Sequence, residues 1–406
     1  MSASNASHII SRTLDSQALP VQPGILDPQK VLTIFGTRPE IIKLAPVIQE
    51  LEKQKEFFKT VNVTPRQHAD MIDPFVRLFD IRVDYDLRVM RPGQSVSAVG
   101  GRILSRLDPV LDHEKPDLVI VQGDTLSAFV GALAGFYHRI PVAHVEAGLR
   151  SQSDLSPFPE EMNRNLITRL ATYHFAATPR NRDVLLSERV ASERIFVTGN
   201  PVVDALKGIA GRCTSNDRLK GVLQATAGSR RIVLTTHRRE SLGRVMTQNL
   251  KVIRNFLERN KDLTLIFPVH PNPQVVRAAN QVLAGHPRIH LSSPFDYAEF
   301  IQLLSESWLI VSDSGGIQEE APSLAKPLLI IRDNTERPEV IEAGVARLVG
   351  GSPKVLAAML EDAYQPGSWV DQIRRVENPF GRGDAGKQIV GILASLLPLK
   401  RIRGLH

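Results

Sequence analysis

Two carboxylates follow apolar runs in the first half of the chain, where they would suit proton transfer. Asp124 lies just past the run 118–122, and Glu146 directly follows the run 141–145. Runs this apolar are typical of buried strands in a parallel sheet. An acid at the end of such a strand is poorly suited to a core, but it can move protons in a cleft. We therefore favour a catalytic role for both residues.

A second acidic pair, Glu160 and Glu161, comes shortly afterwards, directly behind Pro159. An acid at this point also favours a helix N-terminus, because the helix dipole is positive there. That structural role accounts for at least one member of the pair.

Basic residues follow the first apolar run, 31–35. Gly36 lets the backbone turn sharply, and Pro39 suits the first turn of a helix. Arg38 and Lys43 then stand beside the N-terminus of that helix, a place suited to phosphate. A solvated loop with incidental charges is the alternative, but the order of strand, turn and helix favours anion binding.

The second half of the chain repeats this arrangement. His237 and His270 each follow an apolar run, and Ser314-Gly315-Gly316 joins another run to a helix. Small residues at a helix N-terminus let backbone N–H groups reach a pyrophosphate. The sequence holds no HExxH motif and no His/Cys cluster, and its single cysteine excludes an internal disulfide. Nothing in the sequence requires a metal.

These residues need a scaffold that brings strand ends together. Short apolar runs alternate with stretches of helical length and spacing, which is the pattern of a doubly wound α/β fold. The expected strands are 31–35, 118–122, 141–145, 173–177, 195–198, 232–236, 264–269, 288–292, 309–312, 327–331 and 346–349. The expected helices are 40–56, 126–138, 246–259, 296–306 and 353–364.

A polar, Gly- and Ser-rich stretch near 208–230 interrupts the series. We therefore predict two Rossmann-like domains with the ligand bound between them, at the carboxyl ends of the strands. The expected limits are 31–200 for the first domain and 201–386 for the second. Residues 1–30 are expected to form a poorly ordered extension, and a last helix within 387–406 is expected to return to the first domain.

Composition narrows the classes of partner. The chain has 406 residues, of which 42% are hydrophobic, and a net charge of +7, which favours anionic partners. No stretch reaches the roughly 20 apolar residues that a membrane helix needs. Aromatic residues make up 5% of the chain and do not interleave with arginines, as an RNA-binding protein would require. We expect neither a membrane nor a nucleic-acid partner.

A phosphate-loop pattern near the C-terminus does not fit its context. Residues 381–388 read GRGDAGKQ, but no strand precedes them, and Gln388 replaces the hydroxyl that would hold magnesium. A turn before the last helix is the better interpretation.

Taken together, these segments resemble the non-hydrolysing UDP-N-acetylglucosamine 2-epimerases from about Val31 to the C-terminus. So many collinear motifs make a chance match very improbable. The motifs are Gly36-Thr-Arg-Pro-Glu40, Gln122-Gly-Asp-Thr125, His144-Val-Glu-Ala-Gly-Leu-Arg150, Pro157-Phe-Pro-Glu-Glu-Met-Asn-Arg164, Thr198-Gly-Asn200, His237-Arg-Arg-Glu240, Pro268-Val-His270, Asp313-Ser-Gly-Gly-Ile-Gln-Glu-Glu-Ala-Pro-Ser323 and Thr335-Glu-Arg-Pro-Glu339.

The resemblance implies a glycosyltransferase-B-like fold, an active site between the domains, and a cytoplasmic homodimer that needs no NAD or other cofactor. It implies reversible C2 epimerisation of UDP-N-acetylglucosamine (UDP-GlcNAc) to UDP-N-acetylmannosamine (UDP-ManNAc), which supplies sugars for surface polysaccharide. The implied route is elimination of UDP to 2-acetamidoglucal, followed by re-addition from the other face. A hydrolysing epimerase that releases ManNAc, and a UDP-sugar glycosyltransferase of the same fold, stay open as alternatives.

Carried over residue by residue, the resemblance implies site roles for the matching positions. The implied catalytic residues are Asp124, Glu146, Glu160 and His237. The implied substrate-binding residues are Arg38, Lys43, His270, Phe295, Phe300, Ser314, Gly315, Gly316, Glu320 and Arg337. Many members bind a second UDP-GlcNAc as an activator through a Gln-His-Arg segment. Here Gln67 and His68 are followed by Ala69, so an allosteric site would lack one charged phosphate partner.

Overall fold

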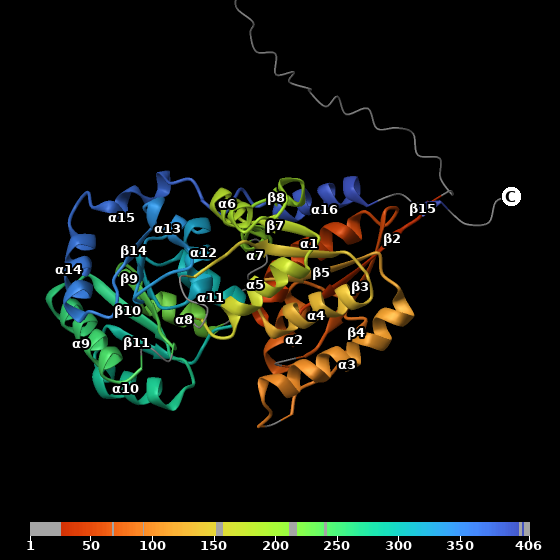
Figure 1. Ribbon diagram of the computed structural model, residues 1–406. Helices are drawn as coiled ribbons and strands as arrows, with labels where there is room; N and C mark the ends of the chain where they lie inside the picture. Colours follow the sequence, from red (N-terminus) through yellow and green to blue (C-terminus); the bar gives the residue numbers. More distant parts are fainter. Residues whose placement is uncertain are drawn as a thin grey trace, which may run out of the picture.

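A computed structural model describes residues 26–66, 69–91, 93–151, 157–210, 217–238, 242–397 and 400–401. The N-terminal half, red to yellow-green, and the C-terminal half, green to blue, form two lobes that lie side by side, except that the last helix and strand, in blue, lie on the first lobe (Figure 1). Each lobe has a parallel sheet covered by helices, so the predicted α/β class with two doubly wound domains is confirmed.

The first sheet has seven parallel strands in the order β4-β3-β2-β5-β6-β7-β8. The strand order reverses between β2 and β5, and a ligand crevice is expected at such a point. The strands are β2 (Gln29–Ile34), β3 (Phe58–Thr64), β4 (Tyr85–Asp86), β5 (Leu118–Gln122), β6 (Val142–Ala147), β7 (Tyr173–Ala176) and β8 (Ile195–Val197).

The second sheet has six parallel strands in the order β11-β10-β9-β12-β13-β14, which is the Rossmann order, and it reverses between β9 and β12. All six strands were predicted from the sequence to within two residues. They are β9 (Arg230–Thr235), β10 (Leu263–Pro268), β11 (Ile289–Ser292), β12 (Leu309–Ser312), β13 (Leu328–Ile330) and β14 (Ala346–Leu348).

Strands β3 and β4 were not predicted, because β3 buries polar side chains. Its residues Thr60, Asn62 and Thr64 are all buried, so no apolar run marks the strand. The Asn62 side chain accepts a hydrogen bond of 2.8 Å from the Thr33 hydroxyl of β2, which satisfies a polar group inside the sheet.

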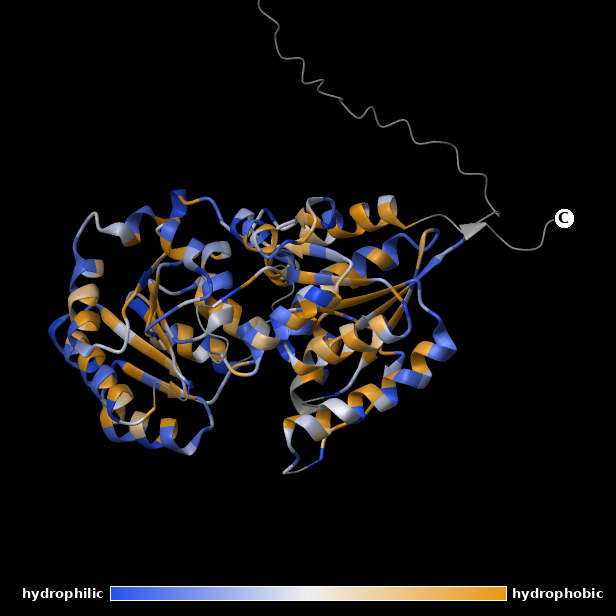
Figure 2. Ribbon diagram, viewed as in Figure 1, coloured by the Kyte–Doolittle hydropathy of each residue, from blue (hydrophilic) through white to orange (hydrophobic). Residues whose placement is uncertain are grey.

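Sixteen α-helices are described, and their apolar faces turn toward the sheets (Figure 2). They are α1 (Arg38–Lys53), α2 (Ala69–Leu78), α3 (Val96–Glu114), α4 (Leu126–Tyr137), α5 (Glu160–Leu170), α6 (Pro179–Ser187), α7 (Pro201–Ala210), α8 (Asp217–Ala225), α9 (Arg244–Arg259), α10 (Pro273–Leu283), α11 (Tyr297–Ser305), α12 (Gly315–Ser323), α13 (Pro338–Glu342), α14 (Pro353–Tyr364), α15 (Trp369–Gln372) and α16 (Ala385–Leu396). In the described part of the chain, no helix combines the length and apolar character needed to cross a membrane.

One continuous apolar cluster joins the two lobes. It includes side chains of α1, α7, α11 and α12 together with strands of both sheets. Helix α16 lies against α1 in the first lobe (Figure 1). The approach is so close that a Cβ added to Gly386 would lie 2.9 Å from the Pro46 carbonyl oxygen. The domain limits drawn from the sequence stay a prediction.

Near the N-terminus, strands begin earlier in the chain than the sequence-based expectation placed them. Within the expected extension, Leu26–Asp27 form β1, which pairs with β15 (Lys400–Arg401), and β2 begins at Gln29. The first residues of β2 have polar side chains, so no apolar run marks the start of this strand in the sequence. Lys30, for example, is a strand residue whose ammonium forms a 2.9 Å ion pair with Glu114. Residues 1–25 lie outside the described residues.

Within the phosphate-loop pattern, residues 381–384 form the turn before the last helix that the sequence indicated, and residues 385–388 begin α16. The Asp204 carboxylate accepts hydrogen bonds from the backbone N–H groups of Ala385 (3.2 Å) and Gly386 (2.9 Å). A carboxylate of the protein itself therefore occupies the helix N-terminus that a phosphate would need.

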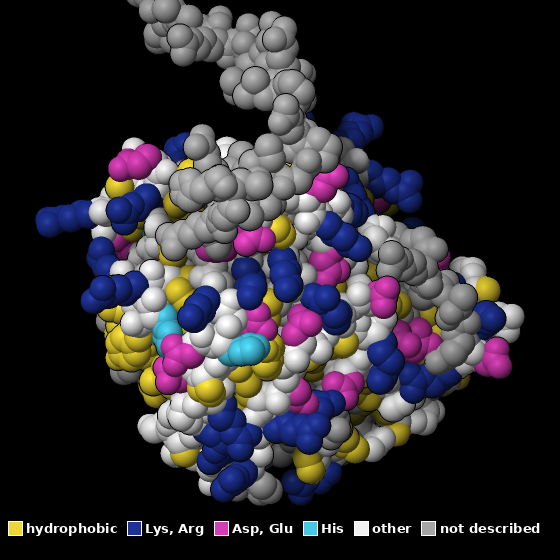
Figure 3. All heavy atoms as spheres, turned by 90° about the vertical axis from the view of Figure 1, so that its right-hand side faces the viewer, with side chains coloured by type: hydrophobic (Ala, Val, Ile, Leu, Met, Phe, Trp, Pro, Cys, Tyr) yellow, Lys and Arg dark blue, Asp and Glu magenta, His cyan; other side chains and the backbone are white. Residues whose placement is uncertain are grey.

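The basic excess is spread over the surface that Figure 3 shows. On this face of the first lobe, Lys and Arg side chains alternate with Asp and Glu. Such a mixture produces no large field of one sign over the part of this face that the structure describes.

Candidate functional site

Candidate residues of both lobes lie at the two strand-order reversals. In the first lobe, Arg38 begins the helix that follows β2, and Asp124 lies in the loop after β5. In the second lobe, the loops that follow β9 and β12 contain His237 and Ser314. Ion pairs run directly between the lobes, because Lys43 of α1 lies 2.8 Å from Glu319 of α12. The carboxyl ends of the two sheets therefore meet at one interdomain site.

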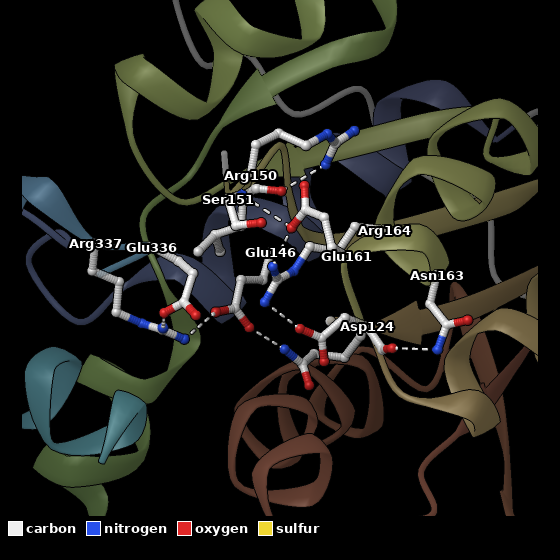
Figure 4. A network of polar contacts seen from close by, with 12 residues as sticks. Asp124, Glu146, Arg150, Ser151, Glu161, Asn163, Arg164, Glu336 and Arg337 are labelled. Carbon is white, nitrogen blue, oxygen red and sulfur yellow. Dashed lines mark hydrogen bonds and ion pairs between the residues drawn. The ribbon is translucent and has the colours of Figure 1, made fainter. Parts of the chain in front are cut away.

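Glu146 lies on β6 at an irregularity in the sheet. Its φ of 64° is in the left-handed region, and the pairing register of β6 with β7 shifts between Val145 and Ala147. A bulge of this kind turns a side chain out of the regular alternation of a strand, and such strain is concentrated at functional sites. The Glu146 carboxylate is thereby directed toward the second lobe (Figure 4).

The Glu146 carboxylate is buried among cations. Lys43 Nζ lies 2.7 Å from its Oε1 and 2.6 Å from its Oε2, and Arg337 Nη2 lies 3.7 Å from Oε1. The Gln122 amide of β5 also donates a hydrogen bond to it. Burial raises the pKa of Glu146 to about 7, although Lys43 and Arg337 act in the opposite direction. This acid can therefore gain or lose a proton near neutral pH.

Asp124 is held by residues of α5. Arg164 Nη2 lies 2.6 Å from the Asp124 carboxylate, and the Asn163 amide donates to the Asp124 carbonyl oxygen at 2.8 Å (Figure 4). Arg164 is fixed in turn by the buried Glu161 at 2.6 Å. Glu161 therefore has a structural role, whereas Glu160 is half-buried as the first residue of α5.

His237 lies at the strand-order reversal of the second sheet. Its Nδ1 is 3.3 Å from the fully buried carboxylate of Asp313, which also accepts the backbone N–H of His237 at 3.0 Å. The ring stacks on His270 with centroids 5.4 Å apart. Burial lowers the pKa of His237, and Asp313 offsets this only in part. In the ligand-free protein, His237 is therefore mostly neutral at neutral pH.

The segment Ser314-Gly315-Gly316 forms the N-terminus of α12. A Cβ added to Gly315 would lie 3.1 Å from Arg337 Nη1, so the close approach of this guanidinium favours glycine. Arg38 is exposed at the first position of α1, and its charge acts on both His237 and Glu320. Backbone N–H groups and cations from both lobes thus surround one region suited to a diphosphate.

The residues implied for the nucleoside come from α12, from α11 and from the segment before α11. Glu320 of α12 is buried and accepts a 2.9 Å hydrogen bond from the Tyr297 hydroxyl. Burial raises the pKa of Glu320 to about 7. Phe300 packs half-buried on α11, and the Phe295 ring lies 4.3 Å from the Arg218 guanidinium carbon. Gln67 and His68 lie outside the described residues.

Sequence reasoning gave no individual role to three residues of this site. Glu319, Arg164 and Asp313 all occur inside the collinear motifs, but each contacts another charged residue rather than open space. A charged side chain directly beside an expected site residue is the signal that could have found them. Among the described residues, no group of three or more His, Cys, Asp or Glu side chains is placed to hold a metal ion.

Two Rossmann-like lobes, with acids and cations meeting at their facing strand ends, define a two-domain α/β enzyme that acts between its domains. The chain belongs to the UDP-N-acetylglucosamine 2-epimerase family, whose model matches residues 49–394, and it is an isomerase.

Similar proteins support this membership over most of the chain. A UDP-N-acetylglucosamine 2-epimerase of Salmonella typhimurium is 44% identical over 371 residues, which span 90% of this chain and 98% of that protein. The epimerase of Neisseria meningitidis bound to UDP-GlcNAc has a TM-score of 0.83 and 41% identity, covering 90% of this chain and 100% of that one. The Methanocaldococcus jannaschii enzyme in complex with UDP-GlcNAc and UDP has a TM-score of 0.76 and 34% identity over the same shares.

Proposed function

We propose that this chain interconverts UDP-GlcNAc and UDP-ManNAc without releasing free sugar. The observation that carries the proposal is the meeting of carboxylates from the first lobe with cations and helix N–H groups from the second. Glu146 lies 3.7 Å from Arg337, which in turn approaches the Ser314-Gly315-Gly316 turn. The bound UDP-GlcNAc and UDP of the similar Neisseria and Methanocaldococcus enzymes agree with this assignment.

The chemistry must invert C2, which is not next to a carbonyl group, so simple enolisation does not suffice. A base removes the C2 proton while the C1–O bond to UDP breaks, and this step forms 2-acetamidoglucal. UDP oxygen then reforms the bond to C1 as a proton is delivered to the opposite face of C2. Asp124, Glu146 and Glu160 supply the carboxyl groups that accept and deliver these protons.

The departing UDP must stay bound between the two steps. Arg38, Arg337 and the N-terminus of α12 offer charge-assisted hydrogen bonds to its diphosphate. His237 is mostly neutral before UDP binds, and a neighbouring diphosphate raises its pKa, so it becomes a cation when the negative charge develops. Lys43 bridges this region to Glu146. In this proposal Glu320 accepts from the ribose hydroxyls, Phe300 and Phe295 approach the uracil, and His270 contacts the nucleotide.

The test is incubation of the protein with UDP-GlcNAc in D2O, followed by NMR of the sugar. We expect UDP-ManNAc to form and deuterium to enter C2 of both sugar nucleotides. Free ManNAc with an equal amount of UDP would identify a hydrolysing epimerase instead. Unlabelled UDP-GlcNAc without any epimer would rule out the proposal and favour a transferase.

A further inference from the structure

Glu319 of α12 lies at the centre of the contacts between the two lobes. Its Oε2 is 2.8 Å from the Nζ of Lys43, which belongs to α1 of the first lobe. Its Oε1 accepts a hydrogen bond from Nε of Arg337, which belongs to the second lobe. Only 1% of the Glu319 side chain is exposed, so both contacts are made away from water.

Glu146 forms ion pairs with the same two cations that Glu319 contacts. Lys43 Nζ lies 2.6 Å from Glu146 Oε2, and Arg337 Nη2 lies 3.7 Å from Glu146 Oε1. We call Lys43, Glu146, Glu319 and Arg337 the interdomain quartet. Each of its two cations lies between the same two carboxylates. When both acids are ionised, the quartet is neutral as a whole.

We propose that Glu319 is a positioning residue for this reaction: it orients Lys43 and Arg337, and its negative charge acts on the carboxyl group of Glu146. The inference rests on the proposed function, which assigns proton transfer to Glu146 and diphosphate binding to Arg337. Buried ion pairs support this role, because removing one partner leaves the charges of the others uncompensated.

The two carboxylates of the quartet have opposite protonation behaviour. Burial would raise the pKa of Glu319, but Arg337 and Lys43 outweigh burial and hold this pKa at about 2. Glu319 is therefore a fixed negative charge at neutral pH. Burial raises the pKa of Glu146 to about 7, and the charge of Glu319 adds to the increase. When the surroundings give two carboxyl groups such different pKa values, one group can serve as a fixed charge while the other exchanges a proton.

Four described residues contact the carboxyl group of Glu146 or act on its charge, and all four enter this argument. Lys43 approaches from α1, Gln122 from β5, Glu319 from α12 and Arg337 from the start of α13. The two cations stabilise the ionised form of Glu146, and Glu319 disfavours it. Loss of the Glu319 charge leaves the cations unopposed, so the pKa of Glu146 must fall. The pKa of Glu146 should fall whether this residue acts as the base or as the acid.

The first variant is Glu319→Gln, which keeps the size of the side chain and removes its charge. In the parent, the pH profile of kcat/KM should bend near pH 7, and we call this bend the pH limb. We expect Glu319→Gln to shift the pH limb to lower pH by about one unit or more. The matched control is Glu336→Gln. Glu336 is also buried and lies 3.4 Å from Arg337, but it pairs with Arg332 and belongs outside the quartet. The same limb should keep its position in this control.

The second variant, Glu319→Asp, keeps the charge but shortens the side chain, so the carboxylate no longer reaches Lys43 and Arg337 together. We expect kcat to fall at least tenfold while the pH limb stays near that of the parent. A parent-like kcat in Glu319→Asp would overturn the proposal, and this outcome is decisive even if Glu319→Gln does not fold.

Titration of the carboxyl group separates this inference from the proposed function. Protein labelled with 13C at the glutamate carboxyl should show a resonance that titrates near pH 7 and is missing from Glu146→Gln. In folded Glu319→Gln this resonance should titrate at lower pH, and an unchanged midpoint would overturn the proposal. If the parent does not epimerise UDP-GlcNAc, the proposed function fails, while the titration still reports the action of Glu319 on Glu146.

Discussion

Individual side chains in the site differ in charge because their surroundings differ. Glu40, Glu146 and Glu320 are buried, and burial raises the pKa of each to about 7. Glu336 is also largely buried, but its pKa is held at about 2 because Arg332 and Arg337 outweigh the effect of burial. A site with both kinds of carboxyl group can hold fixed charges and exchangeable protons at the same pH.

Asp124→Asn should lower kcat by about 10²–10⁴-fold, which is the usual contribution of a positioned acid or base. The amide cannot accept a proton, although it fills the same space beside Arg164. The measurement is the initial rate of UDP-ManNAc formation by NMR.

His237→Ala should abolish turnover in the same assay while the fold persists, because the departing diphosphate loses a cation.

The control for Asp124→Asn is Asp183→Asn, which removes an exposed carboxylate paired with Arg182 at 2.8 Å. Its rate should equal that of the parent, since an exposed pair of this kind contributes little. A parent-like rate in Asp124→Asn or His237→Ala would remove that residue from the catalytic set.

At the scale of elements, the end of β6 determines where Glu146 points. Two positive φ values occur in quick succession, 64° at Glu146 and 89° at Gly148. The chain turns here against α6, and a Cβ added to Gly148 would lie 2.3 Å from the carbonyl oxygen of Asn181. Glycine is required at this position for two reasons, its backbone conformation and the close approach of another chain segment.

Gly148→Ala should therefore lower the free energy of unfolding by about 2 kcal/mol or more, through backbone strain and a direct clash. Urea denaturation monitored by circular dichroism measures this change. The matched control is Gly101→Ala in the interior of α3, where no heavy atom lies within 4 Å of the added Cβ. There we expect a gain of about 0.5–1 kcal/mol, because alanine favours a helix over glycine. Equal stabilities of the two variants would contradict the argument.

At the scale of the whole molecule, contacts on two sides hold the lobes together. The interdomain quartet links α1 and β6 to α12 and the start of α13. Thr178 and Arg180 of the first lobe contact Glu339 and Glu342 of α13, at 2.7 Å and 2.6 Å. Helix α7 adds an apolar contact shared by both sheets. These contacts thus bring charged groups of both lobes into one buried site.

We expect the protein to form a homodimer, as its resemblance to the family implied. Phe136 and Tyr137 at the end of α4 are 56% and 63% exposed, and neighbouring exposed aromatics favour a protein contact. Light scattering should give a mass twice that of the chain, and Phe136→Asp should reduce it to one chain. The control Val276→Asp on α10 changes an apolar side chain of the other lobe that is 36% exposed, and it should stay dimeric. A monomeric parent would contradict the dimer, and a dimeric Phe136→Asp would place its interface elsewhere.

The sequence alone determined the α/β class, most strands, and the strand ends at which polar residues cluster. It could do so because a strand covered on both faces must be apolar throughout, and that run marks its own end. Strand β3 escaped prediction because its inward polar groups are satisfied only by partners such as Thr33 on another strand. The tertiary structure decided the pairing of Lys43 with Glu319, the backbone conformation of Glu146 and the pKa of each buried acid. These properties depend on burial and on charges that residues far apart in the chain bring together.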